Sequence, residues 1–157
     1  MMGGGGMPGE TVEEGVWIKI SGGNIRLYGG VDVLDSNGII EISGGTVIVD
    51  TPRLAVYGSP NGIIDANGET VITGGTFVCY AQSTGSVTRI TKNPSLAVSS
   101  RLSAGAATEV KDAGGQVIYT DTVQNGGSVF FITSDLLKSG ETYTVITGGS
   151  TQSTAAQ

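Results

Sequence analysis

The chain has 157 residues, of which 27 are glycine, 38% are apolar and only 14% are charged. Glycine interrupts nearly every stretch long enough for an α-helix, so the composition favours an all-β domain with a packed apolar core and excludes a helical bundle. The chain has no histidine and a single cysteine, Cys79. Histidine-based catalytic triads, histidine metal sites and an internal disulfide are therefore excluded.

The negative charge is concentrated in the first half of the chain. The net charge is −6, and residues 1–82 contain nine carboxylates and three basic groups, whereas residues 83–157 contain five of each. An acidic surface repels phosphates, so we expect neither nucleic acid nor an anionic membrane surface as a partner. No apolar run approaches the ~20 residues of a membrane span, and we expect no membrane insertion. The sequence does not indicate an oligomeric state.

The first residues are rich in glycine and lack the basic and apolar regions of a signal peptide. Gly3–Gly6 is typical of a flexible linker. We therefore expect residues 1–9 to be a linker, at the start of a fragment of a longer protein.

Two linked motifs repeat along the first half of the chain. Segments 20–28, 42–50 and 72–80 align without gaps around a central Gly-Gly pair, and their starts lie 22 and then 30 residues apart. A second motif, Asp-x-Asn-Gly, occurs at Asp35–Gly38 and Asp65–Gly68. Each copy begins eight residues before the next Ser/Thr-Gly-Gly. Because the two motifs recur at a constant offset from each other, they indicate a structural repeat.

The repeat has the pattern of short strands joined by turns. Apolar residues alternate on both sides of each Gly-Gly, which is the two-residue period of β-strands, and the Gly-Gly and Asn-Gly pairs supply turns. This pattern predicts a β-solenoid of about three coils over residues 10–82, with an apolar ladder at each inward position and Cys79 as an inert core residue. The predicted inward ladders are Ile20/Ile42/Ile72, Ile25/Val47/Phe77 and Leu27/Val49/Cys79.

One outward ladder predicts contact with sugars. It places Tyr28 and Tyr80 on either side of Asp50. An exposed aromatic ring offers a sugar both a flat apolar surface and a hydroxyl group. The alternative interpretation is that tyrosine is simply a favourable strand residue.

The second coil is longer than the first by eight residues, which we place near Thr51–Pro60 as a projecting loop that carries Arg53 and Tyr57. Loops on a rigid scaffold often bind ligands. Arg53 and Arg26 are candidates to pair with a sugar carboxylate, and the alternative is that both are solvated surface residues.

The Asp-x-Asn-Gly turns bring like charges together. In a stack of coils Asp35 lies one rung from Asp65, with Asp32 close by, so the carboxylates repel unless one is protonated or a cation lies between them. Calcium binds carboxylate, amide and backbone oxygens, which makes Asn37 and Asn67 candidate ligands beside the three aspartates. The alternative is that both motifs are ordinary turns with stacked asparagines.

The repeat ends after Ala81, and the strand pattern changes. We expect residues 83–149 to form a small β unit that caps the solenoid and blocks its open strand edge, with a flexible tail over residues 150–157. Asp112–Gly115 is a predicted hairpin turn and Asp135–Gly140 a short turn. The predicted strands are Ser86–Ile90, Ala107–Lys111, Gln116–Thr120, Ser128–Ile132 and Thr142–Ile146.

The order of these motifs is typical of one family. It runs Asp-Ser-Asn-Gly, Ile-Ser-Gly-Gly-Thr-Val-Ile-Val-Asp, Ile-Ile-Asp-Ala-Asn-Gly and Ile-Thr-Gly-Gly-Thr-Phe, followed by Leu-Lys-Ser-Gly-Glu-Thr-Tyr-Thr and a last Thr-Gly-Gly. Over residues 15–149 the chain resembles the C-terminal part of the bacterial carbohydrate-binding-domain proteins of the clostridial polygalacturonate-binding type. The matching positions include Asp32, Asp35, Asn37, Asp65 and Asn67, whereas Val33 stands where the family has glycine.

The resemblance implies a right-handed parallel β-helix similar to that of pectate lyases, an extracellular or cell-surface location, calcium binding, and binding of acidic plant polysaccharide without cleavage. We therefore expect a non-catalytic, calcium-dependent carbohydrate-binding module. The alternative is a structural solenoid or adhesin segment. A pectate-lyase-type enzyme is less favoured, because it needs a base beside the calcium site and only Lys19, Arg26 and Arg53 are basic on the predicted coils. A hydrolase with Asp32 and Asp35 as its carboxylate pair is weaker still, since aspartates are common in turns.

Overall fold

The computed structural model describes residues 11–58 and 62–157 of the chain. These ranges form strands β1 to β14 and one short 3₁₀ helix, and they contain no α-helix. The all-β class predicted from the glycine content is therefore confirmed. The predicted linker over residues 1–9 lies outside the described part of the chain.

The Ser/Thr-Gly-Gly repeat forms a parallel sheet. β1 (Trp17–Leu27) pairs with β3 (Ile39–Asp50), and β3 pairs with both β6 (Thr70–Ile72) and β7 (Thr76–Ala81). Pairing between β1 and β3 is irregular only at the Gly-Gly corner, where each strand bends.

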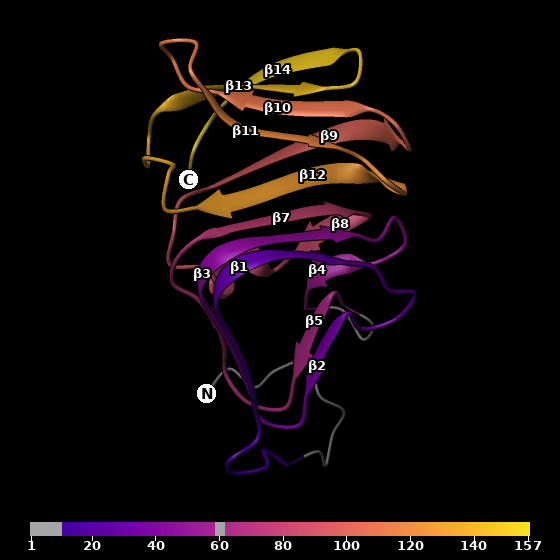
Figure 1. The fold of residues 1–157 in the computed structure, drawn as a ribbon, viewed down its shortest axis with the longest axis vertical. Coiled ribbons are helices and arrows are strands. Elements are labelled where there is room, and N and C mark those ends of the chain that lie inside the picture. The colour runs from indigo at the N-terminus through magenta and orange to yellow at the C-terminus, as the bar shows by residue number, and fades with distance from the viewer. Residues whose placement is uncertain (1–10, 59–61) are drawn as a thin grey trace.

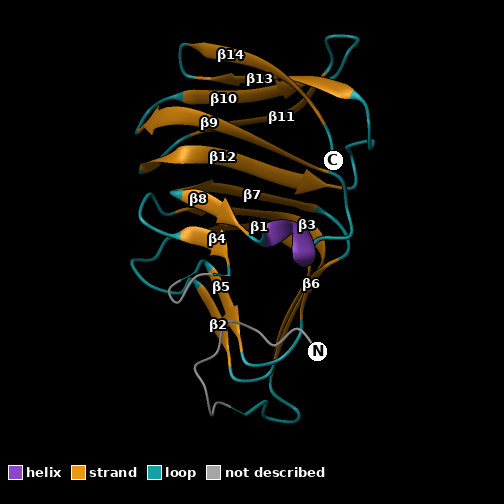
Figure 2. Ribbon diagram, turned by 180° about the vertical axis from the view of Figure 1, so that it is seen from behind, coloured by secondary structure: helices purple, strands orange, loops and turns teal. Residues whose placement is uncertain are grey.

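Two smaller parallel sheets accompany the first. β2 (Leu34–Ser36) pairs with β5 (Ile64–Ala66), and β4 (Ala55–Tyr57) pairs with β8 (Ser83–Gly85). In Figure 1 β2 and β5 lie at the bottom of the molecule, and Figure 2 shows β4 and β8 side by side from behind. Successive passes of the chain thus stack in parallel on three sheets around one core.

The inward ladders are confirmed in their register and in their burial. Ile20 lies beside Ile42 and Ile42 beside Ile72. The other two ladders pair in the same way, and the members from β3, β6 and β7 are buried in one hydrophobic cluster. Cys79 is fully buried there, and its burial raises the pKa of the thiol well above its ordinary value. A thiol in this environment packs as a small apolar residue.

Glycine is required at the corner because the rungs touch there. A Cβ on Gly44 would lie 2.5 Å from the carbonyl oxygen of Ser21, and a Cβ on Gly45 would lie 2.7 Å from the backbone of Gly22 and Gly23. Gly45 also has a φ of +82°, which side chains rarely adopt. The Gly-Gly pair therefore both turns the chain and lets neighbouring backbones approach.

The C-terminal part continues the first sheet and then covers it. β12 (Gly126–Ser134) pairs antiparallel with β7, and β9 (Ser95–Ser103) pairs antiparallel with β12. The edge of β7 is thereby occupied, which protects it from pairing with other chains. Figure 1 shows β7, β12 and β9 following one another up the molecule.

A second sheet lies over these strands. It contains β10 (Ala107–Lys111), β11 (Val117–Thr122), β13 (Thr142–Thr147) and β14 (Ser150–Ala155), in the order β11-β10-β13-β14 with antiparallel pairing. Side chains of both sheets form a second hydrophobic cluster that includes Tyr80. The outer face of β7 is thus an interior surface.

Several predictions for the C-terminal part need correction. Ser86–Ile90 is not a strand but contains the 3₁₀ helix Val87–Arg89. Residues 150–157 are not a flexible tail, because they contain β14 and end in a backbone pairing between Gln157 and Ser95. β9 was not predicted at all.

Other predictions for this part are confirmed. The strand Ala107–Lys111 has the predicted bounds. The hairpin turn at Asp112–Gly115 is closed by a hydrogen bond from the Asp112 backbone nitrogen to the Gln116 carbonyl oxygen, 2.9 Å long. Local alternation and turn chemistry were sufficient to predict both.

Among the described residues, no helix has the length and apolar character needed to span a membrane.

Candidate functional site

The outward ladder predicted to bind sugar is mostly buried. Tyr28 is exposed (53%), but Asp50 and Tyr80 retain only 1% and 0% of their accessible surface. The prediction of an exposed Tyr–Asp–Tyr face is therefore wrong for two of its three members. Its register is right, since Asp50 lies beside Tyr80. The cause is the C-terminal sheet, which packs on this face and converts it into core.

Tyr80 belongs to a buried hydrogen-bond network. Its hydroxyl donates to Asp121 Oδ2 at 2.8 Å and lies 3.1 Å from the hydroxyl of Tyr119. Arg26 donates to Asp121 Oδ1 at 2.8 Å. Burial raises the pKa of both tyrosines well above the ordinary value, so neither ionises at neutral pH. Because Arg26 is bound to Asp121, it joins the two parts of the chain and is not a free partner for a sugar carboxylate.

Asp50 anchors the loop that precedes β12. Its carboxylate accepts hydrogen bonds from the backbone nitrogens of Gln124 (2.7 Å), Asn125 (3.0 Å) and Gly126 (3.0 Å), and from Arg26 at 3.3 Å. Hydrogen bonds to a buried carboxylate are among the stronger ones in proteins. The geometry gives Asp50 a structural role in place of the predicted sugar contact.

The segment Thr51–Pro60 is not wholly a projecting loop. It contains β4, and Tyr57 in that strand is buried in the first hydrophobic cluster. Arg53 lies just before the strand and is exposed. Residues 59–61 lie outside the described part of the chain. Of the two residues predicted to bind from this segment, Arg53 alone is accessible.

Arg53 lies at a cleft on the β4–β8 face. The cleft has a volume of about 660 Å³ and is formed by residues of both strands and of the segments that enter them. It is lined by Arg53, Leu54, Ala55, Gly58, Gln82, Ser83 and Gly85. Arg53 forms no salt bridge with any described residue, so its guanidinium group is available to an anion. Gln82, just before β8, and Ser83, its first residue, add neutral hydrogen-bonding groups.

The three candidate aspartates lie at one edge of the stack. Asp35 and Asp65 are in register on β2 and β5, as predicted. The pKa of Asp32 is raised, first by its burial and then by the charge of Asp35. One carboxylate oxygen of Asp32 is also inaccessible and has no hydrogen-bond partner in the structure. A proton or a cation at this position would relieve the repulsion.

This arrangement fits a cation only in part. Within the described ranges, no group of three or more carboxylate, cysteine or histidine side chains is close enough to hold a metal ion. Calcium also accepts amide and backbone oxygens as ligands, so a site here would need such groups in addition to the aspartates.

The two asparagines of the turns do not bond to each other. Asn37 Nδ2 donates to Glu13 Oε1 at 3.3 Å, and Asn67 Nδ2 donates to the carbonyl oxygen of Thr11 at 3.2 Å. The stacked asparagines of the alternative interpretation therefore do not form a hydrogen-bonded ladder, because the segment that precedes β1 runs over both turns and provides other acceptors. The amide nitrogens tie that segment to the stack.

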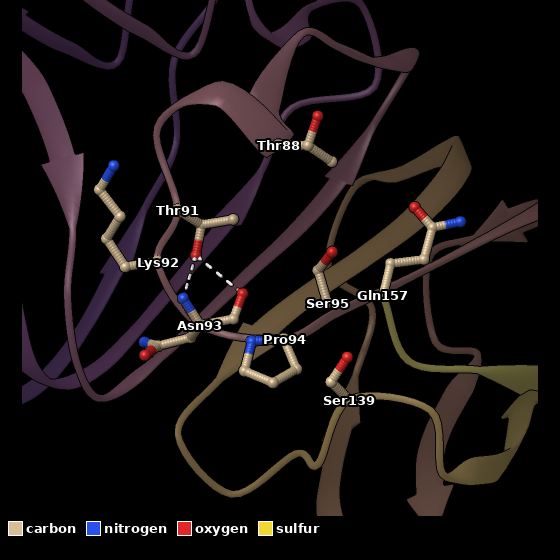
Figure 3. Close-up of a pocket in the computed structure, with 8 residues that line it drawn as sticks. All are labelled: Thr88, Thr91, Lys92, Asn93, Pro94, Ser95, Ser139 and Gln157. Carbon is tan, nitrogen blue, oxygen red and sulfur yellow. Dashed lines mark hydrogen bonds between the residues drawn. The ribbon is translucent and has the colours of Figure 1, made fainter.

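A second cavity, of about 420 Å³, lies where the repeat meets the C-terminal part (Figure 3). The Thr91 hydroxyl donates to the Asn93 carbonyl oxygen at 3.3 Å and accepts from the Asn93 backbone nitrogen at 3.2 Å, as the dashed lines show. The cavity is lined by polar groups and one proline: Thr88, Thr91, Lys92, Asn93, Pro94, Ser95, Ser139 and Gln157.

Sequence reasoning missed several residues of these surfaces. Gln82 and Ser83 follow the last Ser/Thr-Gly-Gly repeat and carry no motif that predicts a strand, although Ser83 begins β8. Lys92 and Thr91 carry no recognisable motif, and only the return of the chain alongside Ile72 brings them into place. Asp121, the partner of Arg26, is 95 residues away in sequence.

Comparison with protein-family models, with curated proteins and with solved structures finds no match to this chain.

Proposed function

We propose that the protein is a non-catalytic module that binds an acidic polysaccharide on a right-handed parallel β-helix closed at one end by the C-terminal sheets. Three parallel sheets in register support the β-helix. The resemblance noted above suggests a polygalacturonate-like ligand, outside the cell or on its surface. Stacked rungs suit such a ligand because they offer a long rigid surface to a repeating polymer.

The observation that carries the proposal is the accessible Arg53 in the β4–β8 cleft. Arginine binds carboxylates through two parallel N–H donors, and Gln82 and Ser83 can bond to sugar hydroxyls beside it. Tyr28, exposed on the first rung, remains a candidate for stacking against a sugar ring.

Calcium is part of this proposal. Asp32 and Asp35, together with amide or backbone oxygens, are the groups that would hold it, because their charges repel and one Asp32 oxygen has no hydrogen-bond partner. A bound calcium ion supplies positive charge to which a sugar carboxylate can bind. The chain itself then contributes the arginine and the neutral donors that orient the polymer.

The test is a calorimetric titration of an acidic oligogalacturonate into the whole chain, once with calcium and once with chelator. We expect saturable heat with calcium. Arg53→Gln should weaken binding by roughly tenfold or more, as expected for one hydrogen-bonded charge pair of about 1.5–3 kcal/mol. Arg101→Gln, which removes an exposed arginine on β9, is the matched control and should leave binding unchanged.

The outcomes separate the parts of the proposal. Equal affinity with calcium and with chelator would show that binding does not need calcium, while the proposed role of Arg53 would stand. If Arg53→Gln bound as tightly as the parent, the cleft would not be the binding site. No saturable heat from the folded chain would overturn the carbohydrate function.

A structural role is the second candidate. It is favoured by the burial of Asp50 and Tyr80 and by the engagement of Arg26, because these predicted ligand contacts instead join the two parts of the chain. A structural solenoid segment would show no saturable affinity for any sugar.

A further inference from the structure

β1 is the end strand of its sheet. It pairs with β3 along one edge, and no described strand pairs with its other edge. Unpaired N–H and C=O groups along such an edge can pair with an added strand. Proteins usually cover or interrupt long exposed edges, but β1 runs for 11 residues.

The corner of β1 has an empty space that the other corners do not have. A Cβ on Gly44 or Gly45 would collide with the backbone of the preceding rung, and the glycines at the third corner, Gly74 and Gly75, are equally restricted. A Cβ on Gly22 would meet nothing within 4 Å, and Gly22 has no positive φ. The described structure therefore gives no reason for glycine at position 22. A further rung packed on β1 would give that reason.

The hydrophobic core is also incomplete at β1. Ile18 and Ile20 are only partly buried, whereas their partners on β3, Ile40 and Ile42, are buried completely or almost so. Large apolar side chains are exposed around this rung, among them Trp17 at 56%. An added rung would cover Ile18 and Ile20 as β1 covers their partners. Burial of apolar surface would then favour its binding.

The charges along β1 indicate what the added strand carries. Lys19 lies in register with Glu41 on the next rung, so a basic residue of β1 stands opposite an acidic residue of the strand paired with it. The strand itself contains Lys19 and Arg26 and no carboxylate. Arg26 already pairs with Asp50 and Asp121. Lys19 forms no salt bridge with any described residue, and its Nζ lies 5.2 Å from the centroid of the Trp17 ring, so it is the basic side chain that an acidic residue on the outer side can meet. Cross-strand pairs of opposite charge favour pairing.

We propose that the free edge of β1 binds, in parallel, a strand of the chain's own repeat type supplied by a separate polypeptide. The strand has an apolar-acidic-apolar sequence before Ser/Thr-Gly-Gly and alternating apolar residues after it. It continues the rung interface already formed by β1 and β3, with its acidic residue opposite Lys19. This inference concerns the end of the stack and does not depend on polysaccharide binding at the β4–β8 cleft.

The test uses the whole chain and a synthetic peptide with the sequence of residues 39–50. Trp17 is the single tryptophan of the chain and lies on β1, while the peptide contains none, so tryptophan emission reports binding directly. We expect a saturable blue shift with one peptide bound per chain. Gly22→Val, which fills the empty corner, should weaken binding at least tenfold. Gly149→Val is the control, since Gly149 has the same open surroundings and lies in the turn between β13 and β14.

A charge exchange tests the register. Lys19→Glu in the protein or Glu41→Lys in the peptide should each weaken binding severalfold, and the two changes together should restore it. Absence of a saturable shift from the folded chain would overturn the proposal, as would equal binding by the Gly22→Val variant. Sedimentation velocity tests whether a second copy of the chain occupies the edge instead. If the chain alone dimerises and the dimer no longer binds the peptide, the edge binds a second copy, and the proposal of a separate strand is wrong.

Discussion

Asp50 was predicted as a sugar contact because its position in the repeat points outward. The repeat correctly predicts its register beside Tyr80. What the repeat does not contain is the loop of residues 124–126, which supplies three backbone donors to the carboxylate. Local alternation separates inward from outward positions, but it does not show which outward positions a distant part of the chain covers.

Replacement of Asp50 should strongly destabilise the fold. Asp50→Asn puts an amide group in place of one oxygen, so at least one backbone N–H would lose its acceptor in a buried site. We expect a loss of about 2–4 kcal/mol in the free energy of unfolding, measured by urea denaturation. Glu69→Gln, at an exposed position, is the control. A loss below about 0.5 kcal/mol would show that the loop is held by other contacts.

Asp121 should make stability depend on acid pH. Burial alone would raise its pKa, but hydrogen bonds from Arg26 and Tyr80 outweigh this and lower the pKa below the ordinary value. A carboxyl group with a lowered pKa in the folded state stabilises the fold fully above its unfolded pKa of about 4 and loses this contribution as the pH falls through the folded pKa. Asp121→Asn should therefore lower Tm at pH 7 by more than it does at pH 2.5. Equal differences at the two pH values would contradict this assignment.

At the scale of elements, the corner glycines distinguish close packing from turn geometry. Gly23 and Gly45 have nearly the same φ, +84° and +82°, but only at Gly45 would an added Cβ have backbone atoms of the neighbouring rung within 3 Å. Both would lose stability on substitution by alanine because of the φ angle. The additional clash exists at Gly45 alone.

Gly45→Ala should therefore destabilise the fold more than Gly23→Ala. The overpacking at Gly45 adds roughly 1–3 kcal/mol to the strain that the two variants share. The free energies of unfolding of both variants and the parent chain measure the difference directly. Equal losses would mean that the rungs separate at the corner without penalty.

The strands also show where sequence patterns are sufficient. β10 was predicted with its bounds because a clear alternation ends at a hairpin turn. β14 has the sequence Ser-Thr-Gln-Ser-Thr-Ala, without a large apolar residue, and forms because β13 offers it a full ladder of hydrogen bonds. Segments of this kind depend on their partner strand, so their own sequence does not predict them.

At the scale of the whole molecule, the C-terminal part completes the fold of the repeat. β12 occupies the edge of β7, and the second sheet buries Val78 and Tyr80, which point away from the first core. The repeat and the C-terminal part are therefore joined by one continuous sheet. The sequence predicted a cap, but not that the cap would cover the outward face of β7.

Removal of the cap should prevent folding. A chain of residues 1–90 would expose the outer face of β7 and leave Asp50 without its backbone donors. We expect this chain to lack a cooperative thermal transition and to aggregate, as judged by circular dichroism and light scattering. A cooperative transition and a monomeric state would show that the repeat folds independently.

The proposed function places the ligand at the β4–β8 cleft and not on the tyrosine ladder. NMR chemical-shift mapping with an acidic oligogalacturonate and calcium tests this most directly. We predict perturbed amide signals at Arg53, Gln82 and Ser83, and unperturbed signals around Tyr80 and Asp121. Perturbations centred on another surface, or none at saturating ligand, would contradict the proposed site and with it the function derived from it.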